Sequence, residues 1–274
     1  MTMAPTTLIG VDFSGARDDN ATWIAMAAVG DDGSIEWQTP SSIRRADLEQ
    51  LLLTIDDPAV AALDFPFGLP AGFAVTQGFI RWGEGLMDSC DRMSTTDQAE
   101  FEEVAREYVA TRGEPRRASD VSPAFSPLHG INPNMRPMTH HGMAMLGRLL
   151  ARARGRFRIP PLPANSSRAQ VTLVELMPGQ LLRARGDSGT GYKNGENAPR
   201  RRDEILTLLE EWTGASLPEG VRSACRANAD CLDAVINLAG ALAWHRDPSA
   251  FVWPTPAQSG FVHDEGWLFT LRGP

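Results

Sequence analysis

Apolar residues near the start of the chain gather in short runs that are separated by turn residues. Residues 8–11 are apolar and lead to Asp12, residues 22–29 form a second run, and residues 34–38 follow the turn at 31–33. Short apolar runs bounded by Gly, Asp and Ser are typical of β-strands. The pattern therefore predicts a meander of three strands.

A helix and two further strands are predicted after the meander. Leucine and isoleucine at i, i+3, i+4 and i+7 indicate a short amphipathic helix over residues 48–55. Two later apolar runs each end on an acid, as the first run does at Asp12: residues 59–64 on Asp64, and residues 171–175 on Glu175. A carboxylate at the end of a buried strand is suited to hold a metal ion or a phosphate on a rigid element.

Residues 71–167 show a different pattern, without a convincing strand. Apolar residues at helical spacing indicate two helices: Phe101, Val104, Ala105 and Tyr108 in the first, then Met145, Leu146, Leu149 and Leu150 in the second. Thr95 and Gln98 match a capping box before the first helix. Residues 112–137 are rich in Pro, Arg and Ser, which is typical of a loop. We interpret 71–167 as a large, mainly helical and loop insertion beside the sheet.

The last third of the chain combines a glycine-rich loop with two helices. The loop at 186–202 carries Lys193 and ends in three arginines, and the apolar residues of 205–212 indicate a helix. Residues 229–244 have the strongest helical pattern, with large apolar residues on one side and three polar residues on the other: Asp230, Asp233 and Asn237. Small residues flank this polar face. We therefore expect the helix to lie close to the sheet and to direct both acids at the strand ends.

Length and composition fit one globular unit. The 274 residues are 42% hydrophobic, which is enough for a full core, so we expect a single α/β domain over 1–274. The chain shows neither a leader pattern nor an apolar stretch long enough to span a membrane. Its three cysteines have no metal-site spacing and indicate neither a disulfide framework nor zinc. We expect a cytoplasmic protein without a membrane partner, and leave a homodimer open.

The candidate acids are the type of ligand that a hard divalent cation prefers. Mg²⁺ and Mn²⁺ bind carboxylate oxygens, whereas clustered carboxylates repel one another strongly when no cation is bound. Two such ions about 3.5–4 Å apart can activate water and stabilise the leaving oxygen of a phosphodiester. The histidines of the middle region, His129, His140 and His141, are expected to be loop or packing residues rather than ligands.

Charge leaves several alternatives open. The net charge of −8 disfavours a protein that coats nucleic acid but allows an enzyme with local basic patches. Lys193 is the only lysine among 26 basic residues, and it has either a specific role or none. A pair such as Asp230 and Asp233, taken alone, fits a solvated helix face as well as a site. Five arginines either form a solvated helix end or contact phosphate: Arg148, Arg152, Arg154, Arg156 and Arg158.

The order of the elements and acids resembles the ribonuclease H-like fold, a mixed sheet flanked by helices. More narrowly, the chain is similar to the family called domain of unknown function 429, which is predicted to contain ribonuclease H-like nucleases. The segments that carry the resemblance run from Gly10 to Ala243: GVDFSGA, ALDFPFGLP, VELMPG, YKNG and DCLDAV. The last of them also resembles the final helix of Holliday-junction resolvases, which has a D-x-x-D-A pattern.

The resemblance implies a metal-binding role for four aspartates. Asp12 would bridge two metal ions, and Asp64 would bind one of them. Asp230 and Asp233 would complete the second metal site.

The same resemblance implies roles for two further residues and an activity. Lys193 would contact the scissile phosphate, and Glu175 would be either a ligand or a residue that positions Lys193. The implied function is a Mg²⁺- or Mn²⁺-dependent nuclease that hydrolyses DNA or RNA by a two-metal mechanism. Two other hypotheses stay open: an ATP-dependent phosphotransferase of the actin and sugar-kinase type, which shares the core, and a catalytically silent binding protein.

Overall fold

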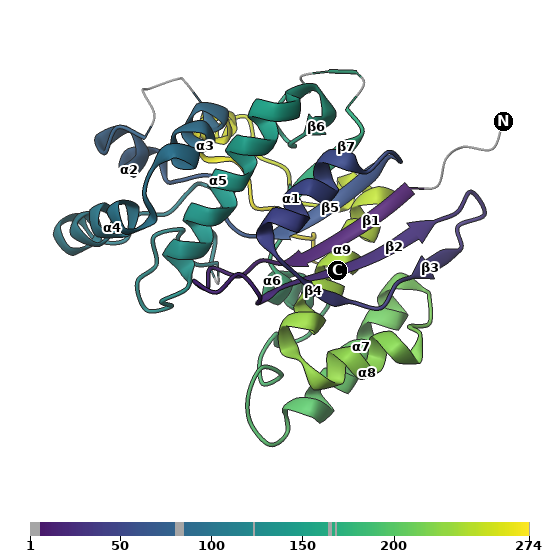
Figure 1. Cartoon of the computed structure of the whole chain (residues 1–274). Coiled ribbons are helices and arrows are strands. Elements are labelled where there is room, and N and C mark those ends of the chain that lie inside the picture. The colour runs from purple at the N-terminus through teal and green to yellow at the C-terminus, as the bar shows by residue number, and fades with distance from the viewer. Residues whose placement is uncertain (1–5, 80–84, 123, 164–165, 168, 274) are drawn as a thin grey trace.

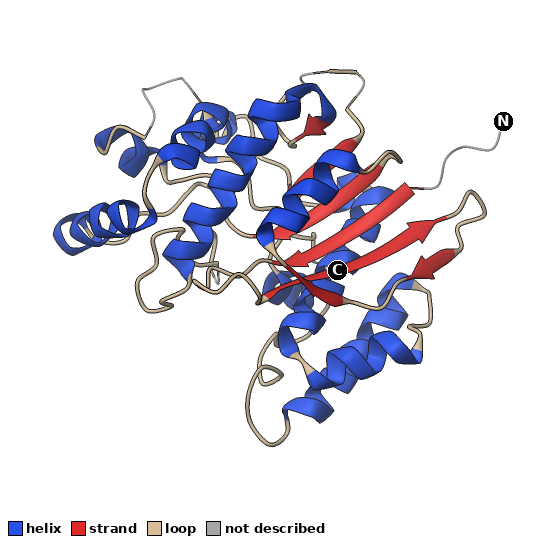
Figure 2. Ribbon diagram, in the orientation of Figure 1, coloured by secondary structure: helices blue, strands red, loops and turns tan. Residues whose placement is uncertain are grey.

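A mixed β-sheet crosses the middle of the molecule, and helices cover both of its faces (Figures 1 and 2). The strand order is β3-β2-β1-β5-β7-β6, and β4 also pairs with β2. The α/β class expected from the sequence is thereby confirmed. This computed structural model describes residues 6–79, 85–122, 124–163, 166–167 and 169–273.

The antiparallel half of the sheet contains the three strands of the predicted meander. They are β1 (Thr6–Asp12), β2 (Thr22–Val29) and β3 (Ile35–Trp37). A fourth strand, β4 (Ser41–Ile43), also pairs with β2 and was not predicted. Its three residues include two exposed serines, so it leaves no apolar run in the sequence.

The parallel half of the sheet places the later acids on neighbouring strands. β5 (Ala59–Asp64) pairs with β1 on one side and with β7 (Val171–Glu175) on the other. β6 (Phe157–Arg158) then pairs with the start of β7. The expectation that 71–167 contains no strand is wrong in this respect, because a two-residue strand is too short to show any periodicity.

The first face of the sheet is covered by α1 (Arg45–Thr54) and α5 (Met135–Ala153), and Figure 1 shows α1 in front of the strands. Two further helices, α3 (Leu86–Thr95) and α4 (Gln98–Arg112), pack against α5. The short α2 (Ala71–Thr76) and η1 (Arg154–Arg156) complete this region. The region 71–167 therefore supplies part of the core as well as loops.

The start of α4 differs from the prediction. Asp97 caps this helix, since its carboxylate accepts hydrogen bonds from the backbone of Ala99 and Glu100. The predicted capping box of Thr95 and Gln98 is wrong. Thr95 is the last residue of α3. An aspartate directly before a helix is a strong cap in its own right.

The second face of the sheet is covered by α9 (Ala229–Arg246), which lies behind the strands in Figure 1. An outer layer packs on α9: α6 (Pro178–Ala184), α7 (Ala198–Thr213) and α8 (Glu219–Ala227). After η2 (Pro248–Ala250) comes α10 (Ser259–Glu265), which contacts α2 and α3. Beyond α10, Leu268 forms a parallel bridge with Glu175 at the end of β7. In the described part of the chain, no helix is long and apolar enough to cross a membrane.

The backbone of α9 touches the sheet directly at Gly10 of β1. A Cβ atom at Gly10 would overlap the backbone of Ala234 and of Leu238 in α9. The close approach predicted from the small residues of α9 therefore depends on a glycine of the strand, and it fixes how α9 lies over the end of β1.

Replacement of Gly10 by alanine tests this contact. We expect Gly10→Ala to lower the free energy of unfolding by about 2–3 kcal/mol, because neither backbone can move aside cheaply. Urea unfolding measures the change. Gly260→Ala is the matched control, since a Cβ at this glycine meets no atom within 4 Å. An equal effect of both substitutions would contradict the close packing.

Candidate functional site

Strand register brings two of the predicted aspartates together. Asp12 of β1 is the aligned partner of Asp64 of β5, so both side chains leave the sheet on the same face. This is the face of α9, because Gly10 contacts α9 two residues before Asp12, and Ala62 packs in the same core two residues before Asp64. Adjacent strands are about 4.8 Å apart, so the two carboxylates are neighbours.

The helix α9 adds a third aspartate from above the strand ends. Asp233 is only 1% exposed, and the amide of Asn237, one turn later, donates a hydrogen bond of 2.9 Å to the carbonyl of Val11. This bond attaches the helix to β1 directly beside Asp12. The polar stripe that the sequence places on one side of α9 therefore faces the strand ends.

The glycine-rich loop before α7 completes the site with a tyrosine and a lysine. The hydroxyl of Tyr192 donates a hydrogen bond of 2.7 Å to Oδ1 of Asp233, and Nζ of Lys193 lies 2.8 Å from Oδ2. Gly191, at φ +78°, turns the chain so that Tyr192 enters the core. The Arg202 guanidinium holds the loop, donating to the carbonyl of Tyr192 at 2.8 Å.

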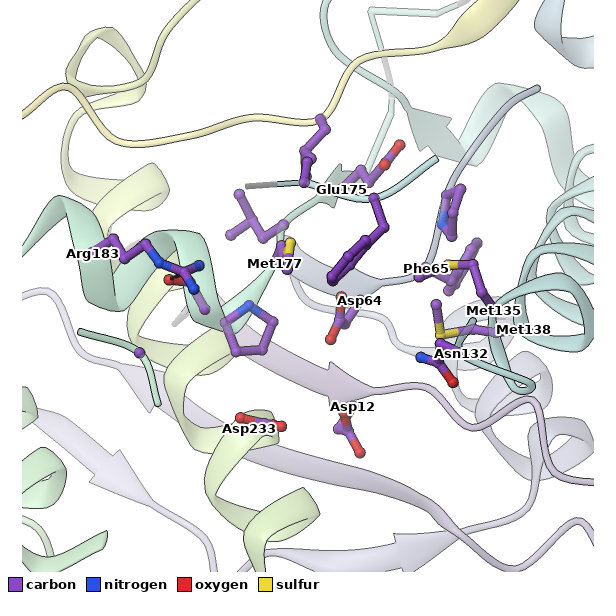
Figure 3. A pocket seen from close by; sticks show the side chains of 18 of the residues that line it. Asp12, Asp64, Phe65, Asn132, Met135, Met138, Glu175, Met177, Arg183 and Asp233 are labelled. Atoms are coloured by element: carbon purple, nitrogen blue, oxygen red, sulfur yellow. Dashed lines mark hydrogen bonds between the residues drawn. The ribbon is translucent and has the colours of Figure 1, made fainter. Parts of the chain in front are cut away.

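These side chains line a pocket of about 340 Å³. Figure 3 shows Asp12, Asp64 and Asp233 grouped at one side of it. Five of the six predicted site residues line this pocket: Asp12, Asp64, Glu175, Lys193 and Asp233. Asp230 does not. It lies half-buried in the first turn of α9, one turn before Asp233, and acts on the site through its charge.

Glu175 also lines the pocket, but its carboxylate lies on the first face of the sheet, the face that α1 and α5 cover. Its aligned partner in β5 is Leu63, one residue before Asp64, so register directs Glu175 away from α9. Both carboxylate oxygens accept hydrogen bonds from Arg117, at 2.5 and 2.9 Å, and the backbone N–H of Phe67 adds a third at 2.9 Å. Glu175 contacts Arg117 rather than Lys193.

Arg117 is the centre of a buried network that the sequence did not single out. It is 4% exposed and also forms an ion pair with Asp120 at 2.8 Å. Glu265 of α10 accepts hydrogen bonds from the backbone of Ala71 and Ala118 beside it. The network ties the connection before α5 to the end of β7. Arg117 lies in a loop, where no periodic pattern marks a residue as buried.

The three aspartates are buried close together, and their negative charges repel one another. Burial, followed by the charges of Asp233 and Asp64, raises the pKa of Asp12 well above its ordinary value. Burial and then Asp233 raise the pKa of Asp64 to about 8. Burial also raises the pKa of Asp233, although Lys193 and Tyr192 oppose this shift. Despite burial, the carboxylates of the pocket raise the pKa of Lys193, so its ammonium stays charged.

The donor set fits a hard cation in its chemistry. Among the described residues, no hydrogen-bond donor contacts the carboxylates of Asp12 or Asp64, and oxygen ligands suit Mg²⁺ or Mn²⁺. Asp233 would supply a third carboxylate. Over the same residues, no three His, Cys, Asp or Glu side chains are placed as ligands of a single ion. The aspartates are thus neighbours in one pocket, with the Lys193 ammonium as the nearest positive charge.

Other candidates from the sequence lie elsewhere. Arg148 and Arg152 pair with Glu49 of α1, and Arg156 binds the carbonyl of Leu52, so these three arginines contact the protein itself, which favours a helix end over a phosphate patch for them. The three histidines make packing or loop contacts: His129 with Glu114, His140 with the carbonyl of Thr96, and His141 with the ring of His140.

The thiols of Cys225 and Cys231 form no disulfide, although their sulfur atoms lie 3.6 Å apart.

Comparison with known proteins places the chain in a family. A family model described as protein of unknown function (DUF429) matches residues 10–258. The chain belongs to this family. The family expected from the sequence is thereby confirmed, and the DUF429 match includes every residue of the acidic pocket named above. Comparison of this DUF429 chain with curated proteins and with solved structures gave no match.

The raised pKa of Asp64 predicts a pH-dependent stability in the presence of a chelator. Between about pH 4 and pH 8 the folded protein keeps a proton at Asp64 that the unfolded chain releases, so stability falls as the pH rises through this interval. Asp64→Asn removes this titration. We expect the variant to gain about 1–2 kcal/mol over wild type at pH 8, discounted for the open pocket, and little at pH 4.5.

Urea unfolding at both pH values measures this difference. Asp31→Asn, at an exposed turn residue, is the control and should behave like wild type. A variant that is equally stable relative to wild type at both pH values would show that Asp64 does not hold its proton.

Removal of Arg117 tests the buried network. Arg117→Met leaves Glu175 and Asp120 without their cation, so we expect a loss of about 3–5 kcal/mol in the free energy of unfolding. Arg44→Met breaks an exposed ion pair with Asp47 and should leave the stability close to that of wild type, because water screens such pairs. Chemical unfolding of both variants gives the comparison, and similar losses would contradict the importance assigned to Arg117.

Proposed function

We propose that this protein is a divalent-metal-dependent nuclease with a ribonuclease H-like fold. The observation that carries the proposal is the pocket in which Asp12 and Asp64, from aligned strand ends, meet Asp233 from a helix. Buried carboxylates with raised pKa values in a concave site are typical of functional sites. The sheet order, with three antiparallel strands continued by parallel ones, supports the fold assignment.

The metal ligands of this proposal are Asp12, Asp64 and Asp233, with Asp230 adding negative charge from the next turn of α9. When bound, a pair of Mg²⁺ or Mn²⁺ ions would activate water and neutralise charge on the phosphate. The chain itself holds Asp233 in place through the hydroxyl of Tyr192. Glu175 acts from the other face, where it orders the wall of the pocket through Arg117.

Lys193 is proposed to contact the phosphate. Its side chain is 57% exposed although its ammonium touches the buried Asp233, so it can exchange this partner for a phosphate oxygen at the mouth of the pocket. An ammonium on a flexible stem suits this exchange better than a rigid guanidinium. This would explain why the single lysine among the 26 Lys and Arg residues stands at this position.

The substrate is proposed to be nucleic acid, and the protein to act in the cytoplasm, with a homodimer left open. The phosphotransferase alternative is less favoured, because those enzymes use two copies of the core and the described residues form one sheet. The silent binding protein shares the fold and differs only in activity. Metal binding and cleavage therefore separate the hypotheses.

Titration calorimetry with Mn²⁺ tests the site. We expect binding that strengthens as the pH rises through about 8, because the carboxylates must lose their protons. Asp12→Asn and Asp233→Asn should weaken binding at least tenfold and lower Mn²⁺-dependent cleavage of DNA or RNA by about 100-fold or more. Asp31→Asn should leave both unchanged.

The results separate the three hypotheses. Mn²⁺ binding without cleavage of any nucleic acid would favour the silent protein. ATP hydrolysis that depends on Asp12 would favour the phosphotransferase. Binding that persists in both site variants would contradict the proposed ligands.

A further inference from the structure

The pocket has an apolar wall as well as an acidic side. Phe65, Met135 and Met138 line this wall, and Asn132 lies next to the methionines. Figure 3 shows these side chains to one side of the aspartates, with Arg183 across from them. A pocket that combines carboxylates, an apolar wall and an amide is suited to a ligand with both a charged and an apolar ring-shaped part.

The apolar wall extends to the protein surface. Phe125 lines the pocket and is 46% exposed, and its ring stacks on His129 with the centroids 4.5 Å apart. The same connection between α4 and α5 exposes Val121 at 67% and Ile131 at 89%. Of these three exposed apolar side chains, Phe125 is the one that lines the pocket, so it offers an aromatic ring at the pocket entrance.

We propose that the pocket takes one unpaired nucleotide of a single-stranded nucleic acid, an inference that rests on the proposed nuclease function. The base would lie against Phe65 and the two methionines, with Phe125 at the entrance. Methionine sulfur and aromatic rings both make favourable contacts with flat π-systems. The amide of Asn132 can pair with the polar edge of the base, and the phosphate would then lie near the aspartates and Lys193.

The size of the pocket supports an unpaired nucleotide. Its volume of about 340 Å³ is at the lower end of the range of about 300–1,000 Å³ that small-molecule pockets span. This leaves room for one nucleotide, but not for a base with its paired partner.

Charge supports the same conclusion. Duplex binding draws most of its affinity from many phosphate contacts on a broad basic surface. This chain has a net charge of −8, and Arg148 and Arg152 are already paired with Glu49. Single-strand binding draws on the stacking of bases upon exposed aromatic rings, which the position of Phe125 allows.

The test uses stopped-flow fluorescence of a short DNA strand that carries 2-aminopurine, mixed with the full chain and Mn²⁺. This records binding separately from later cleavage. We expect the single strand to bind at least tenfold more tightly than the same strand in a duplex. Phe125→Ala should weaken single-strand binding about fivefold or more and raise KM with little change in kcat.

The matched control is Phe261→Ala. Phe261 of α10 is 48% exposed, close to the exposure of Phe125, but it does not line the pocket. We expect its replacement to change binding less than twofold. The RNA strand of the same sequence is tested in parallel, and tight binding of either single strand with the expected dependence on Phe125 supports the proposal.

The outcomes distinguish this proposal from the nuclease function. Duplexes that bind as tightly as their single strands, or equal effects of the two phenylalanine variants, would overturn the base-binding wall even if Mn²⁺-dependent cleavage is found. Single-strand binding that depends on Phe125 without any cleavage would support the wall and contradict the hydrolytic activity.

Discussion

The acidic pocket depends on the direct contact between the backbones of α9 and β1. Because Gly10 has no side chain, the turn of α9 around Ala234 lies against the strand, and Asn237 binds the carbonyl of Val11. Asp233 is thereby held over the end of β1, where Asp12 and Asp64 stand side by side through the register of two parallel strands. A larger separation of helix and sheet would move Asp233 away from Asp12 and Asp64.

This packing brings negative charges together at a cost in stability. Lys193 and Tyr192 compensate Asp233, while Asp12 and Asp64 have raised pKa values. On the other face of the sheet, Arg117 fully engages Glu175. Glu175 is therefore paired, whereas Asp12 and Asp64 have no hydrogen-bond donor among the described residues. Natural proteins accept destabilising arrangements of this kind at functional sites.

The local parts of this architecture could be predicted from the sequence, and the long-range parts could not. The apolar runs that end at Asp12 and Asp64 mark real strands, and the polar stripe of the last long helix does face the sheet. Which face Glu175 takes depends on strand register, and β7 is buried on both faces, so it has no alternation of apolar and polar residues that would set the register.

The residues that sequence reasoning missed share a cause. Tyr192 and Arg117 lie in irregular segments, where burial follows from tertiary contacts and leaves no periodic signal. Asp230 was expected beside Asp233, but the pocket reaches only one turn of α9. The unpredicted strands β4 and β6 are too short to show alternation.

The most direct test of the account is anomalous diffraction from crystals grown with Mn²⁺. We predict Mn²⁺ bound by Asp12 together with Asp64 and Asp233, with the Lys193 ammonium displaced from Asp233. Mn²⁺ bound only at other acids, or no anomalous signal in the pocket at a saturating concentration, would contradict it.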